Sequence, residues 1–154
     1  MPLTVGWIRE ARRDRQAEAE RLRLERAELV RKRREQCVRL LRLARDFRVL
    51  VENTHESTGP ELDANAVRVR QSAADIASQA DEVEFMVPGT GTEALALAAA
   101  ARELGAPIAD KENRELGLLS NPPVFKEFDQ CLAEFTQTSR MALGSGHHVL
   151  GLRR

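Results

Sequence analysis

The feature that most constrains the fold is a stretch from residue 7 to residue 58 that contains neither proline nor glycine. Proline removes a backbone donor, and glycine costs about 1 kcal/mol in a helix interior, so their absence permits one long helix. Alanine, leucine, arginine and glutamate, which favour helix, fill most of this stretch. We predict a helix from about Val5 to Asn53, N-capped by Thr4. At ~1.5 Å per residue it would be roughly 70 Å long.

The two halves of this predicted helix differ. After Glu35 the apolar residues are dense and cover a broad arc, which is typical of a helix that contacts two neighbours. Between Arg9 and Arg34, by contrast, mostly charged residues occur. One heptad position holds Leu22, Leu29, Gln36, Leu43 and Leu50, and the companion position holds Arg26 and Arg33. The coiled-coil register therefore weakens toward the N-terminus.

A second predicted helix carries the clearest apolar spacing in the chain. Its apolar residues recur every four and three positions, and alanine fills every other place. They are Leu62, Ala66, Val69, Ala73, Ile76, Ala80, Val83 and Val87. Alanine permits close approach of a neighbouring helix, so this pattern predicts tight helix–helix packing. Pro88-Gly89 ends the helix.

Two more helices are expected in the C-terminal half. Thr90 and Glu93 have capping-box spacing, and the alanine-rich helix that follows should stop at Leu104, before Gly105 and Pro107. A short helix or turn is expected at 110–119. Asn121-Pro122 should begin the last helix, which continues to about Leu143. One side of this last helix holds Val124, Phe125, Phe128, Cys131, Leu132 and Phe135.

These elements predict an all-α fold: an antiparallel bundle of about four helices with one very long, partly overhanging, coiled-coil-like N-terminal helix. Strand formers are scarce, because the chain has no tyrosine and one tryptophan. We expect one domain over 1–143, with 1–36 as the basic overhang and 37–143 as the bundle, followed by a flexible tail over 144–154. The later helices are too short to cover the first one along its whole length.

The formal net charge of zero hides a polarity. From Met1 to Arg48 the chain has 15 basic and 8 acidic residues, a balance of +7, and the rest balances at −7. Such asymmetry suits self-association through opposite charges, or a basic arm that approaches an anionic surface.

One sequence motif is compatible with nucleotide chemistry. Gly89-Thr90-Gly91 and Ala94 match G-x-G-x-x-A, the phosphate-binding turn of dinucleotide-binding units, where a strand feeds the turn and a helix follows. The alternative is an interhelical turn in which Val83 and Val87 complete the apolar face. We favour that alternative, because no second strand candidate exists to build a sheet.

No metal or cofactor site is expected. His147-His148 lie in the glycine-rich tail without further ligands nearby, and His55 has no evident partner. Cys37 and Cys131 fall on apolar helix sides, where buried reduced thiols are the ordinary state, and they could meet in the core. Carboxylates on the second helix lie away from its apolar face and suit a solvated surface.

The candidate interaction surface lies on the first helix. Arg31-Lys32-Arg33-Arg34 could neutralise phosphates, but interleaved glutamates at i,i+3 and i,i+4 spacing favour an exposed helix or a protein contact. Trp7 and Ile8 form an apolar tip before several arginines, which suits a membrane surface or another subunit. The candidate residues are Trp7, Ile8, Arg12, Arg15, Leu22, Leu29, Arg31, Lys32, Arg33 and Arg34.

Three stretches carry a resemblance to a known group: Trp7-Ile8-Arg9, 81–88 (DEVEFMVP) and 128–135 (FDQCLAEF). In this layout the chain resembles uncharacterised small helical-bundle proteins of high-GC bacteria. The resemblance implies a helical bundle and no particular activity. Many such proteins begin with a membrane anchor, which this sequence lacks, so membrane attachment is not carried over.

We therefore expect a cytoplasmic, non-enzymatic protein that acts through protein contacts, as a homo-oligomer formed by the long helix. Neither a signal peptide nor an apolar run of ~20 residues is found. One alternative is an anion-binding module that uses the basic helix on nucleic acid or an acidic membrane surface. A second is a nucleotide-binding enzyme that uses the turn from Gly89 to Gly91.

Overall fold

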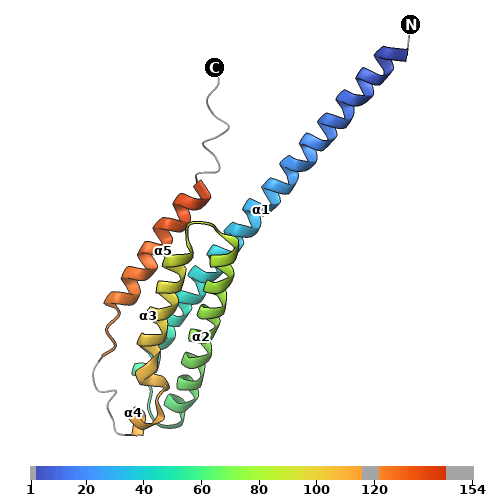
Figure 1. Ribbon diagram of the computed structural model, residues 1–154. Helices are drawn as coiled ribbons and strands as arrows, with labels where there is room; N and C mark the ends of the chain where they lie inside the picture. Colours follow the sequence, from blue (N-terminus) through green and yellow to red (C-terminus); the bar gives the residue numbers. More distant parts are fainter. Residues whose placement is uncertain (1–2, 116–121, 145–154) are drawn as a thin grey trace. The chain divides into compact units, whose positions relative to one another are not determined.

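The structure is a computed structural model that describes residues 3–115 and 122–144 (Figure 1). Within these residues it contains helices and no strand, so the predicted all-α class is confirmed. The helices are α1 (Leu3–His55), α2 (Gly59–Met86), α3 (Gly91–Ala109), α4 (Lys111–Glu115) and α5 (Lys126–Gly144).

The chain divides into two compact units, Met1–Lys32 and Arg33–Arg154. The division falls inside α1. The helix itself runs without a break from Leu3 to His55. Below, residues 5–32 are called the N-terminal segment, and the described residues from 33 onward are called the bundle. The boundary expected from sequence, between 36 and 37, lies four residues inside the bundle.

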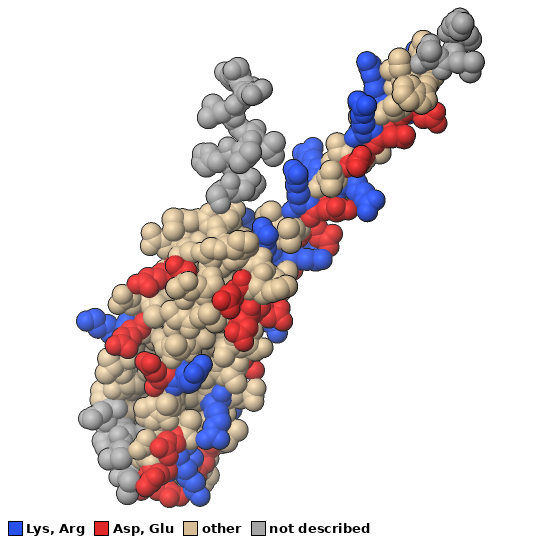
Figure 2. Space-filling view, in the orientation of Figure 1, with Lys and Arg blue, Asp and Glu red and all other residues tan. Residues whose placement is uncertain are grey.

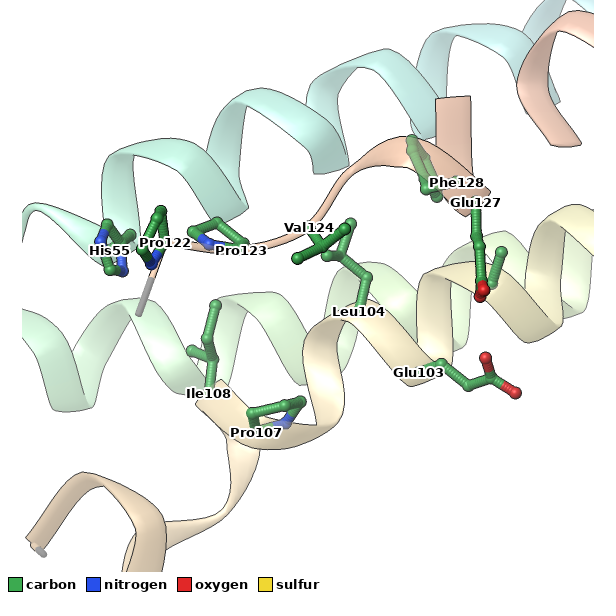
Figure 3. A pocket seen from close by; sticks show the side chains of 11 residues that line it. His55, Glu103, Leu104, Pro107, Ile108, Pro122, Pro123, Val124, Glu127 and Phe128 are labelled. Atoms are coloured by element: carbon green, nitrogen blue, oxygen red, sulfur yellow. The ribbon is translucent and has the colours of Figure 1, made fainter. Parts of the chain in front are cut away.

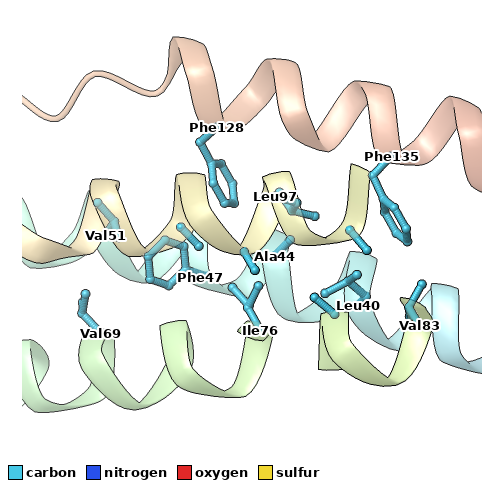
Figure 4. Packing of buried hydrophobic residues seen from close by; sticks show 14 of the residues in the cluster. Leu40, Ala44, Phe47, Val51, Val69, Ile76, Val83, Leu97, Phe128 and Phe135 are labelled. Atoms are coloured by element: carbon cyan, nitrogen blue, oxygen red, sulfur yellow. The ribbon is translucent and has the colours of Figure 1, made fainter. Parts of the chain in front are cut away.

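In the bundle, residues 33–55 of α1 are followed by α2, α3 and α5, and these four helices run alternately in opposite directions (Figure 1). Figure 4 shows side chains from all four pointing into one interior. Phe47 of α1 and Phe128 of α5 meet with ring centroids 5.7 Å apart. The expected antiparallel bundle is thus present.

The apolar face predicted for α2 is the face that packs. Six of its eight residues are buried, and Leu62 and Ala73 are half-buried. The buried members are Ala66, Val69, Ile76, Ala80, Val83 and Val87. Val87 ends the helix in an extended conformation, because the following Pro88 disfavours helical geometry at the residue before it.

The predicted end of α3 was wrong. The helix continues through Gly105 and Pro107 to Ala109. Gly105 is buried where α3 approaches its neighbours: a Cβ at this position would lie 3.0 Å from Val69 Cγ1 and 3.3 Å from Phe47 Cζ. The glycine therefore permits close packing inside the helix and does not terminate it.

The predicted capping box and the predicted start of the last helix were also wrong. Thr90 is the N-cap of α3, but its hydroxyl donates to the Val87 carbonyl at 2.8 Å and makes no capping bond. α5 begins at Lys126 and not at Pro122, where the following Pro123 disfavours helical geometry. Val124, expected on the apolar side of the last helix, is 77% exposed before it. Asn121 lies outside the described residues.

Arginines from other helices bind the C-terminal carbonyls of α2 and α3. Arg33 donates to the Met86 carbonyl at 2.9 Å. Arg70 donates to the carbonyl of Ala109, and Arg114 donates to that of Ile108, at 2.9 and 2.8 Å. The last carbonyls of a helix lack partners within it and carry partial negative charge, so cationic donors stabilise these ends.

Two further polar contacts join α1 to the helices around it. Arg48 makes a two-pronged ion pair with Asp129 of α5, at 2.8 and 3.1 Å, and its guanidinium lies 4.3 Å from the centre of the Phe125 ring. The hydrogen bond that Arg48 donates to the Asp129 carboxylate raises the pKa of Arg48. On another side, buried Gln79 of α2 donates to the Gln36 side chain at 2.6 Å. These contacts fix α1 in register with the bundle.

Candidate interaction surface on α1

The N-terminal segment contains no buried residue between Val5 and Lys32. Its apolar side chains include Trp7, which is 74% exposed, and Leu24, which is 65% exposed. The remaining large apolar side chains are also exposed: Val5, Ile8, Leu22, Leu29 and Val30. The large apolar side chains of this segment are therefore left exposed by the described part of the chain.

The candidate residues of this segment fall largely on one line. Positions spaced alternately by three and four form what we call the a/d stripe. It consists of Val5, Ile8, Arg12, Arg15, Ala19, Leu22, Arg26 and Leu29. The heptad spacing that the sequence shows at Leu22, Arg26 and Leu29 also extends back to the N-terminal end of the segment, through Arg15, Arg12, Ile8 and Val5. In an α-helix such a spacing keeps residues on one face, where a partner helix can pack.

The same heptad positions continue into the bundle, where they are covered. Leu40, Phe47 and Thr54 occupy the first of the two positions, and all three are fully buried. Arg33 precedes them at that position and binds the end of α2 through the Met86 carbonyl. The first stripe position is therefore buried in the bundle, whereas Gln36, Leu43 and Leu50 at the second position are half-buried, so the covered face of α1 overlaps the a/d stripe in part.

Charges of both signs are interspersed along the N-terminal segment (Figure 2). Arg21 pairs with Glu25 at 2.9 Å, and Lys32 pairs with Glu28 at 3.0 Å, each across one helical turn. The hydrogen bond and charge of Lys32 lower the pKa of Glu28. Such pairs stabilise an exposed helix by a few tenths of a kcal/mol each.

The basic run at 31–34 is divided between different environments. Lys32 forms an ion pair with Glu28, and the half-buried Arg33 donates a hydrogen bond to the Met86 carbonyl at the end of α2. Arg31 and Arg34 have exposed side chains. Four adjacent cations project around the whole helix, as expected from sequence, but they do not form one uniform anion-binding surface.

The glycine turn between α2 and α3 links two helices, and no strand enters it. Gly89 has a positive φ of 83°, which glycine adopts easily. A Cβ at Gly91 would lie 2.8 Å from Cγ of Glu84, so an acidic side chain packs against the turn. Together with the inward hydroxyl of Thr90, this geometry differs from the strand–turn–helix unit that cradles phosphates.

The two cysteines are both free thiols. Burial raises the pKa of Cys37. Burial also raises the pKa of Cys131, and the nearby carboxylates of Glu134, Glu127 and Glu103 raise it further. Both thiols are thus held in the protonated form, which is the less nucleophilic one.

The bundle has a surface cavity of about 360 Å³ between the end of α1, α3 and the start of α5 (Figure 3). His55 lies at one end of the cavity, and the carboxylates of Glu103 and Glu127 lie at the other. Leu104, Ile108 and Phe128 contribute apolar walls. Because the imidazole and the carboxylates lie apart, they do not form a common ligand set.

Within residues 3–115 and 122–144, no group of three or more His, Cys, Asp or Glu side chains is arranged to hold a metal ion. His147 and His148 lie outside this part of the chain. None of the described helices has the length and apolarity needed to cross a membrane. No protein family, curated protein or solved structure matches the chain. The resemblance to helical-bundle proteins of high-GC bacteria therefore stays a prediction.

Proposed function

We propose that this protein is a non-enzymatic scaffold that self-associates through the N-terminal segment of α1. The observation that supports the proposal is the row of apolar side chains that the described chain leaves uncovered from Val5 to Val30. On the a/d stripe, Ile8, Leu22 and Leu29 have the spacing that a second helix can cover. A scaffold role follows from this surface, whose residues are suited to contacts with protein.

Single exposed apolar residues are common on protein surfaces and require no explanation. The N-terminal segment differs because none of its residues from Val5 to Lys32 is buried against the described part of the chain. An isolated helix is only marginally stable in water, and most helical stability in proteins comes from packing an apolar face. A partner helix would supply that packing and remove Leu22 and Leu29 from water. The segment is therefore more stable in an assembly than alone.

Light scattering over a range of protein concentrations tests the proposal. We expect a mass of two or more chains, falling toward that of one chain on dilution. The paired substitution Val5→Glu with Leu29→Glu should shift the protein to a monomer, because two carboxylates would then face the partner helix in place of apolar side chains. A wild-type chain that stays monomeric at the highest concentration would refute the proposal.

Leu24→Glu provides the matched control. Leu24 is on the same segment and is more exposed than Leu22 or Leu29, but it lies off the a/d stripe. It should leave the mass unchanged. Circular dichroism and thermal unfolding of all variants should show an intact bundle, because the substituted residues lie outside it. Equal loss of association in Leu24→Glu would show that general hydrophobicity, and not the stripe, drives the association.

A second candidate function is anion binding by the same segment. Arg12, Arg13 and Arg15 are exposed and close in sequence, which favours contact with a polyanion. Lys32 and Arg33 support it less, because each already has a partner in the chain. Binding to duplex DNA and to anionic vesicles, titrated with salt, tests this function. Lack of binding to both at low salt would eliminate it.

A further inference from the structure

We infer that two copies of this chain pair in antiparallel orientation along the a/d stripe, with Ile8 of one copy beside Arg26 of the other. The inference rests on the proposed function and specifies its geometry. Two observations carry it: the distribution of arginines along the stripe, and the point on α1 at which Arg33, at a stripe position, binds the end of α2.

Three of the eight stripe positions hold arginine: Arg12, Arg15 and Arg26. In a parallel, in-register pair each stripe residue faces its own copy. All three arginines would then meet an identical cation between the two helices. Like charges held together away from water are unfavourable, and each apolar contact would lie within about two turns of at least one such pair.

An antiparallel pair centred on residue 17 removes all of these like-charge contacts. In this arrangement each stripe arginine faces an apolar residue of the other copy, and Val5 faces Leu29, so no arginine faces another arginine. The four pairs are Val5 with Leu29, Ile8 with Arg26, Arg12 with Leu22, and Arg15 with Ala19. The long arginine side chains can extend along the apolar partner and keep their charged ends in water.

Charges beside the stripe bring both unlike and like signs together in this arrangement. Glu18 of one copy lies next to Ala19, and therefore next to Arg15 of the other copy. A parallel pair would instead gain contacts between Glu18 and Arg23, and an antiparallel pair brings the two Glu18 side chains near each other. These flanking pairs are exposed, and exposed ion pairs contribute little. The residues on the stripe therefore decide the orientation.

The length of uncovered helix fits the antiparallel pair. The stripe is available to a partner only as far as Lys32, because the position of Arg33 is taken by the end of α2. With residue 17 at the centre, Val5 of each copy faces Leu29 of the other, so all four pairs lie within the uncovered part of the stripe.

Disulfide trapping tests the orientation. Cys37→Ala with Cys131→Ser removes the natural thiols, and Ile8→Cys and Arg26→Cys are then added singly and together. A disulfide requires Cα atoms within about 7 Å. In the antiparallel pair the two copies of residue 8 are roughly 27 Å apart along the axis, as are the two copies of residue 26. Residues 8 and 26 of one chain are separated by the same length.

We expect the double variant to form a covalent dimer under mild oxidation and each single variant to form almost none. Covalent dimers in the single variants would show a parallel pair and overturn the inference while leaving self-association intact. A non-covalent dimer in which no variant forms a disulfide would also overturn it. A monomeric cysteine-free background, measured by light scattering, would instead refute the proposed function itself.

Discussion

Gly105 is a residue at which three bundle helices approach one another closely. It is buried inside α3, and its missing side chain leaves room for Val69 of α2 and Phe47 of α1. An added methyl group at this place must displace two packed side chains of the core. Helix propensity alone would favour alanine over glycine, so the packing and the propensity oppose each other at this residue.

We predict that Gly105→Ala lowers the free energy of unfolding by about 1 kcal/mol, because overpacking costs more than the gain in helix propensity. Urea unfolding measures the change. Gly6→Ala is the control, since a Cβ there would have no atom within 4 Å and should leave the unfolding of the bundle unaltered. A more stable Gly105→Ala variant would show that the core relaxes around the methyl group.

The thiols give a pH dependence whose sign can be stated. Burial raises the pKa of Cys37 and of Cys131 in the folded chain. An unfolded thiol ionises near pH 8.5, so it releases its proton at lower pH than the folded thiols. The folded state then binds more protons than the unfolded state, and stability falls as pH rises above about 8.5.

We predict that this alkaline loss of stability is reduced when Cys37→Ala and Cys131→Ala are combined. Urea unfolding from pH 7 to pH 10 measures it. Few other groups titrate in this range, because the chain has no tyrosine and its lysines are only Lys32, Lys111 and Lys126. Equal slopes in the wild-type protein and the variant would contradict the assignment to the thiols.

Among the elements, α4 is joined to both α3 and α2 by one arginine. Arg114 of α4 is 11% exposed; it donates to the Ile108 carbonyl at 2.8 Å and to Asp63 of α2 at 3.1 Å. One side chain therefore caps α3 and ties α4 to α2. Because α4 has five residues and no buried residue, it has little else to hold it in place.

We predict that Arg114→Ala destabilises the bundle by about 1–2 kcal/mol, since it removes charge-assisted hydrogen bonds to the end of α3. Thermal or urea unfolding measures the loss. Arg102→Ala changes an exposed arginine of α3 and should cost less than about 0.5 kcal/mol. Similar losses in both variants would mean that general charge, and not the cap, accounts for the effect.

The interior of the elements could be predicted from sequence, but several of their ends could not. The spacing from Ala66 to Val87 predicted the buried face of α2 because helical period depends only on nearby residues. The end of α3 depends on Arg70 and Arg114, which are distant in sequence, and on the packing around Gly105. Local signals such as glycine and proline were therefore misleading there, since contacts with other helices decided the outcome.

At the scale of the whole molecule, the two units differ in how much of the buried apolar core each contains. Every buried residue of the apolar core lies between Cys37 and Phe135. We predict that a chain starting at Arg33 folds with a melting temperature within a few degrees of that of the full chain, and that it is monomeric. Calorimetry and light scattering measure the two properties. A fragment that fails to fold would show that the bundle needs the N-terminal segment.

The candidate surface was predicted in part. Leu22, Leu29 and the arginines were named from sequence because exposed apolar residues in a charged helix are unusual. Arg33 was assigned to the same surface, but its bond to Met86 places it in the bundle. That bond joins residues 53 positions apart, so no local pattern could have indicated it.

The division within α1 has a consequence for the motions of a single uninterrupted helix. Up to Lys32 the backbone amides are protected only by bonds within the helix, so they open with the rapid unwinding and rewinding of an isolated helix. From Arg33 onward, the same helix opens only when the packed core around Leu40 and Phe47 is disrupted. Deuterium uptake along α1 should therefore change abruptly by orders of magnitude within about one turn, with no break in the backbone to mark the place.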